Sequence, residues 1–166
     1  MRPDELAAHL RPRFADTVVA RGEVTTIVER DDLLEALAWM RDDETLSLGF
    51  CSSVTATDWP DADPRLWVAY ELLSIQHNHR LRVKVGLAER DAHVPSVTPL
   101  YPTADWHERE THDFYGIVFD GHPDLRPLLM PDGWEGFPLL KTEELGGVNT
   151  QYHGAFIPPV DTRTSP

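Results

Sequence analysis

A strict alternation of apolar and polar residues runs from His79 to Leu87 and is the clearest structural signal in the chain. The apolar residues share one side and the basic residues the other, as expected for a strand with one buried face. Residues 66–74 are apolar without clean alternation, which predicts a strand covered on both faces. The link at 75–78 is short, so the two strands are predicted to form an antiparallel hairpin. The alternating set is Leu81, Val83, Val85 and Leu87 against Arg80, Arg82 and Lys84.

Two other segments carry the helical period of apolar residues. In the first, Asp32 and Glu35 have the spacing of a capping box. The second helix is predicted between Thr103, a suitable N-cap, and Gly116, a suitable residue just beyond its end. The apolar positions that follow the capping box fall on one helical face: Leu33, Ala36, Leu37 and Met40.

The order of these elements favours an α+β fold. Segments 17–28 and 46–55 are predicted as further strands, the first turning at Arg21 and Gly22. Together they predict a mixed, mainly antiparallel sheet packed by two helices. Because Gly and Pro become frequent after residue 120, we divide the chain into a 1–120 α/β core domain and a 121–166 loop-rich C-terminal segment. Its long extended tail is expected to dock on a neighbouring protein.

The charge balance narrows the range of partners. Fifteen Lys and Arg against 28 Asp and Glu give a net charge of −13. Such a surface repels phosphate backbones and anionic lipid, which argues against nucleic acid and against direct membrane insertion. No apolar run approaches the ~18 residues that a membrane-spanning helix needs. The acidity serves either to keep the protein in solution or to meet a basic partner, and both interpretations stay open.

The inventory of reactive groups is small. Cys51 is the single cysteine, which excludes an internal disulfide and fits a reducing cytoplasm. One thiol cannot hold an iron–sulfur cluster, which takes about four cysteines, or a Cys-rich zinc site. The sequence also has no Gly-x-Gly-x-x-Gly, no phosphate-binding loop and no Gly-x-Ser-x-Gly elbow. We therefore expect no cofactor and no catalytic residue on this chain.

Histidines are the remaining candidates for a metal site. His107 and His112 are five residues apart, which places them about 140° apart on a helix instead of on one face. His77 and His79 could share one face of a strand end, but no third ligand lies near them in the sequence. A zinc site is therefore not expected.

Charged residues also lie within the second helix. Trp106, Glu110 and Phe114 fall within about 80° of one another, with Arg109 and Asp113 beside them, which predicts carboxylates among apolar side chains. One interpretation is an ion pair between Arg109 and Asp113. The favoured one is that Arg109 and Glu110 bind loops or a partner, because the ion pair leaves Glu110 without a contact. Acid–base catalysis lacks an accompanying nucleophile or metal.

Four motifs carry a resemblance to a known family. They are Glu-Arg-Glu and Asp-x-x-Gly-Ile within 106–117, Gly-His-Pro-Asp-Leu-Arg at 121–126, and Glu-Gly-x-Pro-Leu at 135–139. In this order and spacing they resemble the C subunit of NADH:quinone oxidoreductase, respiratory complex I, over about residues 45–141. The matching residues are Trp106, Glu108, Arg109, Glu110, Asp113, Gly116, His122, Pro123, Asp124, Arg126, Glu135, Gly136 and Pro138.

The resemblance implies a structural role within a larger assembly. Members of this family belong to the hydrophilic arm, carry no flavin or cluster, and brace the quinone-site (D) subunit beside the cluster-bearing B and I subunits. The chain would lie peripherally on the cytoplasmic side of the plasma membrane while electrons pass from NADH to quinone. On this view Glu108, Arg109 and Glu110 fix the helix against the loop at 122–126 and against the contact between subunits.

One departure from the family pattern leaves alternatives open. After Leu139 the family usually has Arg-Lys-Asp-x-Pro, whereas this chain has Leu-Lys-Thr-Glu-Glu at 140–144. Equivalent subunits occur in ferredoxin-linked complexes and membrane-bound hydrogenases, and the chain could serve one of these. A free-standing enzyme or small-molecule binding domain would use Glu108, Glu110, His112 and Asp113, but these residues spread around the helix instead of converging.

Overall fold

The structure of the protein is a computed structural model in which residues 1–143 are described. A five-stranded sheet with strand order β1-β2-β5-β4-β3 forms the centre, and β6 and β7 form a separate two-stranded parallel sheet that contributes to the same core. The helices are α1 (Pro3–Leu10), α2 (Leu33–Asp42) and α3 (Ala104–Tyr115). The strands are β1 (Thr17–Ala20), β2 (Glu23–Ile27), β3 (Phe50–Asp58), β4 (Leu66–Ser74), β5 (His79–Leu87), β6 (His93–Pro95) and β7 (Val118–Asp120).

The α+β class and the mainly antiparallel sheet are confirmed. The β4–β5 hairpin has the predicted bounds, and its register runs from Leu66 opposite Leu87 to Ser74 opposite His79. Only the pairing of β2 with β5 is parallel within the five-stranded sheet. The predicted inward residues of β5 are buried, but the second face of β4 is only half-buried at Trp67 and Leu73. The expectation that β4 is covered on both faces was therefore wrong.

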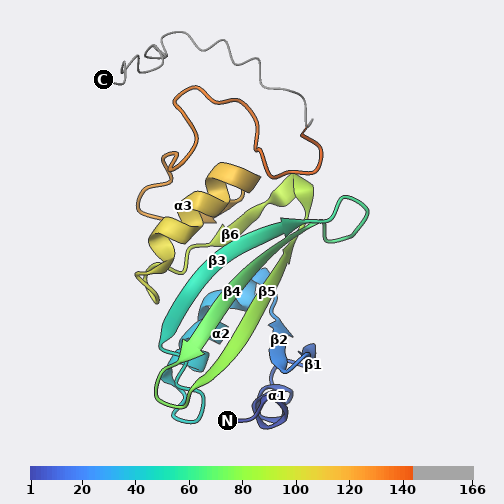
Figure 1. The fold of residues 1–166 in the computed structure, drawn as a ribbon, viewed down its shortest axis with the longest axis vertical. Helices are drawn as coiled ribbons and strands as arrows, with labels where there is room; N and C mark the ends of the chain where they lie inside the picture. Colours follow the sequence, from blue (N-terminus) through green and yellow to red (C-terminus); the bar gives the residue numbers. More distant parts are fainter. Residues whose placement is uncertain (144–166) are drawn as a thin grey trace, which may run out of the picture.

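The apolar core lies on one face of the sheet, under α2 (Figure 1). All four predicted apolar residues of α2 are buried there. The predicted capping box is wrong, since the Asp32 side chain makes no capping hydrogen bond. A 3₁₀ turn at Arg30–Asp32 runs directly into the helix, so Asp32 already has helical dihedral angles of −92° and −4°. An N-cap side chain reaches the helix amides from an extended backbone, which Asp32 lacks.

Helix α1 was not predicted from the sequence, and β3 starts later than predicted. Pro3 is the first residue of α1, and the Glu5 carboxylate accepts hydrogen bonds from the Arg2 amide (3.1 Å) and guanidinium (2.8 Å). Leu6 and Leu10 of α1 are buried in the core. The strand expected at 46–55 begins at Phe50, because the chain before it forms a turn that still buries its leucines.

The C-terminal part of the described chain lies at one end of the molecule. In Figure 1, α3 runs beside β3, and segment 121–143 loops over α3 at the end opposite α1. Of the segment predicted at 121–166, the structure describes residues 121–143, and from here on the C-terminal segment means this described part; the tail predicted beyond it falls outside the described residues. None of the helices within 1–143 is both long and apolar enough to cross a membrane.

Candidate functional site

The buried face of α3 is polar. Its buried residues are Ala104, Glu108, Thr111 and Asp113, whereas Trp106 is 62% exposed. The predicted stripe through Trp106, Glu110 and Phe114 is therefore not the buried face. A polar face can be buried here because β3 is an edge strand whose carbonyl groups need donors.

Threonine hydroxyls of α3 and its N-cap position supply two of those donors. Thr103 Oγ1 donates to the Cys51 carbonyl (2.8 Å), and Thr111 Oγ1 donates to the Val54 carbonyl (3.3 Å). Thr103 precedes the helix as predicted, but its side chain bonds to β3 and caps no amide of α3. The helix is thus attached to the sheet edge through hydrogen bonds as well as packing.

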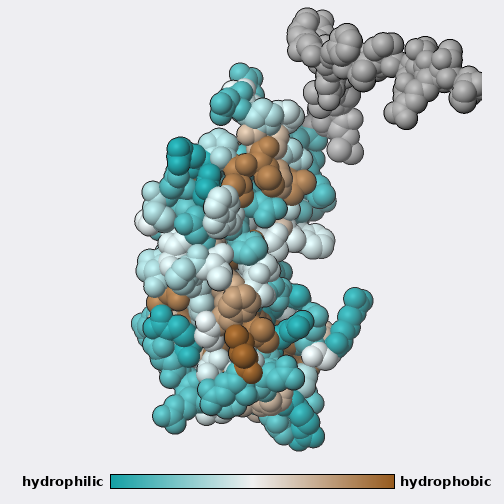
Figure 2. Space-filling model, turned by 60° about the vertical axis from the view of Figure 1, so that its left-hand side comes forward, coloured by the Kyte–Doolittle hydropathy of each residue, from teal (hydrophilic) through white to brown (hydrophobic). Residues whose placement is uncertain are grey.

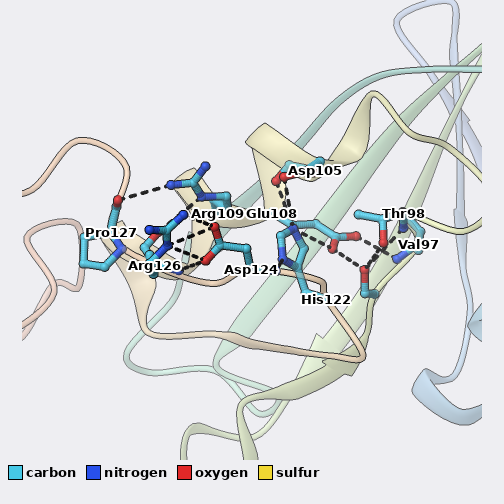
Figure 3. Close-up of polar contacts among 10 residues, drawn as sticks. Val97, Thr98, Asp105, Glu108, Arg109, His122, Asp124, Arg126 and Pro127 are labelled. Atoms are coloured by element: carbon cyan, nitrogen blue, oxygen red, sulfur yellow. Dashed lines mark hydrogen bonds and ion pairs between the residues drawn. The ribbon is translucent and has the colours of Figure 1, made fainter.

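Glu108 is the most enclosed ionisable residue of α3 and has no exposed surface. Its Oε1 accepts the Val97 amide (2.7 Å), and its Oε2 accepts the Ser96 hydroxyl (2.6 Å) (Figure 3). Burial raises the pKa of Glu108 to about 7, against the effect of these two hydrogen bonds, and the nearby Asp105 charge adds to the rise. The residue therefore fastens α3 to the loop that follows β6, at the cost of burying a carboxyl group.

His122 joins the C-terminal segment to the start of α3. Its ring is fully buried, with Nε2 3.2 Å from the Asp105 carbonyl oxygen and 3.9 Å from Glu108 Oε2. Its Nδ1 accepts the Asp124 amide at 3.0 Å, so the two contacts together assign the proton to Nε2. Figure 3 shows this ring between α3 and the loop.

Arg109 holds the next part of the segment. Its guanidinium donates to the carbonyl oxygens of Arg126 (3.2 Å) and Pro127 (3.3 Å), and lies 5.1 Å from the centre of the Trp106 ring. The interpretation of Arg109 and Asp113 as an ion pair is therefore wrong. The favoured interpretation, in which Arg109 binds a loop, is confirmed for this residue.

The Asp113 carboxylate binds the backbone of the same segment. Its Oδ2 accepts three consecutive amides, those of Leu128 (3.1 Å), Leu129 (2.8 Å) and Met130 (2.9 Å). Burial tends to raise the pKa of Asp113, but the three amide hydrogen bonds outweigh it and the pKa lies below its ordinary value. The carboxylate is therefore held ionised in a nest of backbone donors.

A second buried carboxylate fixes the far end of the segment. Asp58 forms a bidentate ion pair with Arg65 (2.7 and 2.9 Å) and accepts a hydrogen bond from the Lys141 amide (2.7 Å). The hydrogen bond from Arg65 is the main reason why the pKa of Asp58 is lowered. This pair is not evident from the sequence, because Asp58 and Arg65 flank a turn and nothing in their spacing points to residue 141.

The remaining motif residues occupy different environments. Gly116 has a left-handed φ of +72°, and a Cβ there would lie 2.5 Å from the Phe137 ring, so both its conformation and its position require glycine. Asp124 pairs with Arg126 (2.6 Å), which lowers the pKa of Asp124 to about 2. Glu110 is half-buried, and its side chain makes no hydrogen bond to another residue within 1–143. Pro123, Glu135 and Gly136 are on the outside of the segment, and Pro138 is half-buried.

The C-terminal segment turns apolar side chains outward. Leu129 is 60% exposed, and Trp134, Phe137 and Leu139 are also exposed. Figure 2 shows apolar side chains at the surface at this end of the molecule. The segment is thus fixed to the core by polar contacts to its backbone and by the half-buried Leu125 and Leu140, while the four other large apolar side chains named above remain exposed.

The carboxylates of α3 have different partners. Glu108 accepts a backbone amide and a hydroxyl, and Asp113 accepts three backbone amides through Oδ2. Within the described residues, no three His, Cys, Asp or Glu side chains lie together as a metal site would require. The arrangement is that of an attachment between helix and segment.

Comparison with known families agrees with this architecture. The sequence model of the family described as "Respiratory-chain NADH dehydrogenase, 30 Kd subunit" matches residues 26–149. The chain belongs to this family. The resemblance found in the sequence motifs is thereby confirmed, and the motif residues of α3 and the C-terminal segment lie within the matched range.

Individual relatives of the 30 Kd family support the assignment. The NADH-quinone oxidoreductase C subunit of Nocardioides sp. is 49% identical over 149 residues, which cover 89% of this chain and 60% of the relative. The corresponding C subunit of Salinispora tropica is 45% identical over 170 residues, covering 98% of this chain and 69% of the relative. The chain spans about three fifths of the length of the first curated relatives that it matches.

Solved structures extend the likeness to the fold. A trypsin-resistant fragment of Nqo5 (1–134) aligns with a TM-score of 0.63 and 30% identity, over 75% of this chain and 100% of the fragment. A chain of a membrane-bound sulfane sulfur reductase, an archaeal respiratory membrane complex, aligns with a TM-score of 0.67 and 24% identity, over 78% of each chain. This second likeness concerns the fold alone.

Proposed function

We propose that the chain is a non-catalytic structural subunit in the hydrophilic arm of a proton-translocating NADH:quinone oxidoreductase. In this role it braces the quinone-site subunit beside the cluster-bearing B and I subunits. Membership of the 30 Kd family supports its place in such a complex. The observation that carries the bracing role is the C-terminal segment. Its backbone is held by hydrogen bonds with side chains of α3, and several of its apolar side chains are exposed.

The energetics of that segment favour a partner. Each Å² of apolar surface removed from water contributes roughly 25 cal/mol, so exposed leucine and tryptophan side chains gain by being covered. Leu129, Trp134 and Leu139 are such residues, and tryptophan is enriched at the energetic centres of interfaces. The polar contacts of Arg109 and Asp113 fix the backbone beforehand, which lowers the entropy lost on docking.

The same proposal assigns parts to the rest of the chain. Residues 1–120 form the core domain, and 121–166 form the part that docks on the quinone-site subunit. His122, Arg109 and Asp113 hold the C-terminal segment in place, whereas Glu110, Pro123 and Glu135 are available to touch the partner. The complex would place the chain peripherally on the cytoplasmic side of the plasma membrane.

The departure at 140–144 bears on which complex the chain serves. Leu140 is half-buried against the core, and the next amide, that of Lys141, donates to Asp58. Leucine in place of the family's basic residue thus supports attachment to the core, which is compatible with the same docking mode. An equivalent role in a ferredoxin-linked or membrane-bound hydrogenase complex differs in the electron-donor subunits that accompany the chain.

A pair of variants tests the docking surface. Leu129→Asp places a charge in the proposed interface, and Ile75→Asp places one at the β4–β5 turn, where the side chain is 77% exposed. Each tagged variant is expressed in the native host, and the quinone-site subunit is quantified after purification in mild detergent. Leu129→Asp should lower its recovery at least about 10-fold, while Ile75→Asp should leave it unchanged. Equal recovery with both variants would exclude the C-terminal segment as the docking surface.

A further inference from the structure

One face of the five-stranded sheet carries no helix within 1–143. In Figure 1, α2 lies behind β3, β4 and β5, and the face toward the reader is open. Apart from the buried Ala69, the side chains of β4 and β5 on this open side are polar or half-buried, in contrast to the buried leucines and valines beneath. We call it the outer face and define it by Arg80, Arg82 and Lys84 of β5 and Trp67, Glu71 and Leu73 of β4.

The outer face has a charge opposite to that of the chain as a whole. The protein has a net charge of −13, yet three cations follow one another along this side of β5. The two carboxylates at this face, Glu71 and Glu23, both pair with Arg82. Among the described residues, the side chains of Arg80 and Lys84 have no carboxylate partner. Two cations are therefore left without a counter-charge.

Lys84 is partly withdrawn from water. Its Nζ lies 4.5 Å from the centre of the Trp67 ring, and burial, followed by repulsion from Arg82, lowers the pKa of Lys84. A half-buried ammonium group with only an aromatic ring beside it gains from an incoming carboxylate more than a fully hydrated one does, because the local dielectric constant is lower. The position of Lys84 thus favours a negatively charged ligand.

A groove of about 740 Å³ opens at the end of this face where β5 begins. Leu73, Arg80 and Arg82 line it from the outer face, whereas the buried residues Leu6, Val24 and Leu72 line it from the core side, so the groove lies between the sheet and the start of α1. A groove of this size accommodates several side chains of a polypeptide, and Arg80 provides it with an uncompensated charge.

We propose that the outer face is a second docking surface, and that its occupant is an acidic segment of another protein of the assembly. This inference rests on the proposed function only in requiring that the chain works within a complex. Charge complementarity selects the occupant, because a basic stripe on an otherwise acidic protein attracts a local cluster of carboxylates. Polyanions such as nucleic acid are repelled by the surface around the stripe.

Zero-length cross-linking tests the occupant directly. The chain has two lysines, Lys84 and Lys141, so few amines compete. The complex is isolated through a tag on this chain and treated with a carbodiimide, which activates carboxyl groups so that an amine can displace the adduct as a urea and form an amide. Mass spectrometry should find Lys84 Nζ joined to an Asp or Glu of a different protein of the complex.

Three results would overturn the inference. Lys84 could be joined only to Glu71 or Glu23 of its own chain, it could be joined to a second copy of this chain, or it could remain open to acetylation in the complex. If Lys84 remains open while the quinone-site subunit is still recovered, the outer-face inference fails and the proposed function stands. Recovery of the chain alone would contradict both the outer-face inference and the proposed function.

A matched pair of charge reversals provides the second test. Arg80→Glu and Arg90→Glu each change the net charge equally, and both side chains are exposed. Arg90 lies in the 3₁₀ turn after β5 and outside the outer face. Arg80→Glu should lower the yield of the Lys84 cross-link at least about 10-fold relative to Arg90→Glu. Equal yields from the two variants would contradict the charge-based docking.

Discussion

Replacing Glu108 by glutamine should change how the stability of the protein depends on pH. The folded protein raises the pKa of this carboxyl from its ordinary value of 4.5 to about 7, chiefly by burial. Between these values the folded chain keeps a proton that the unfolded chain has released. Stability contributed by Glu108 is therefore present in full below pH 4.5 and is lost as the pH rises through 7.

The size of the effect follows from the shift. One pKa unit corresponds to about 1.4 kcal/mol, so the native protein should lose about 3 kcal/mol between about pH 4 and about pH 8 relative to Glu108→Gln. Glutamine preserves the geometry, because its carbonyl oxygen can accept the Val97 amide and its NH₂ group can donate to Ser96 Oγ. The variant should therefore fold while lacking the titration.

Urea unfolding at a series of pH values measures this difference. Subtracting the curve of Glu108→Gln from that of the native protein cancels the contributions of the other carboxylates. Glu110→Gln removes a carboxylate that is only half-buried on the same helix, and it should alter stability by less than about 0.5 kcal/mol at either end of the pH range. A difference curve for Glu108→Gln that stays flat would refute the assignment of Glu108 as a carboxyl kept protonated by burial.

Three further substitutions probe the attachment of the C-terminal segment. Asp113→Ala removes the acceptor of three amides and should destabilise the protein by about 3 kcal/mol, with faster hydrogen exchange at residues 128–130; unchanged exchange would contradict this. Gly116→Ala should cost more than about 1 kcal/mol in thermal unfolding, because φ is positive and the ring of Phe137 occupies the space; a neutral effect would show that the ring is displaced easily. Asp58→Asn should lower the free energy of unfolding by about 3 kcal/mol at about pH 7 and by progressively less in strongly acidic solution. The reason is that the lowered pKa of Asp58 stabilises the fold only while the carboxyl is ionised. A loss of stability independent of pH would contradict the ion pair.

Local patterns were sufficient to predict the central hairpin. Strands β4 and β5 have nine residues each, which is long enough to define their bounds, but only β5 has the strict alternation that also defines its inward face. Helix α1 has eight residues, so it offers only two turns in which to show a period. Its signals, a proline at the first position and apolar residues at 6, 7 and 10, are present but short.

The orientation of α3 could not be predicted from apolar periodicity. Trp106 dominates any apolar count on this helix, yet it is exposed, whereas Glu108 and Thr111 are buried. Burial of these polar residues depends on partners distant in the sequence, the amide of Val97 and the carbonyl of Val54. Family resemblance identified the motif residues, but their contacts with backbone groups follow only from the tertiary structure.

The central claim, that this chain braces the arm of a quinone-reducing complex, is tested most directly by the composition of what it binds. The native tagged chain is purified in mild detergent from its host, and the associated proteins are identified by mass spectrometry. The account predicts recovery of the quinone-site subunit together with Cys-rich cluster-bearing subunits, and NADH-oxidising flavin subunits as the electron donor. A chain that is recovered alone, as a compact monomer, would contradict it.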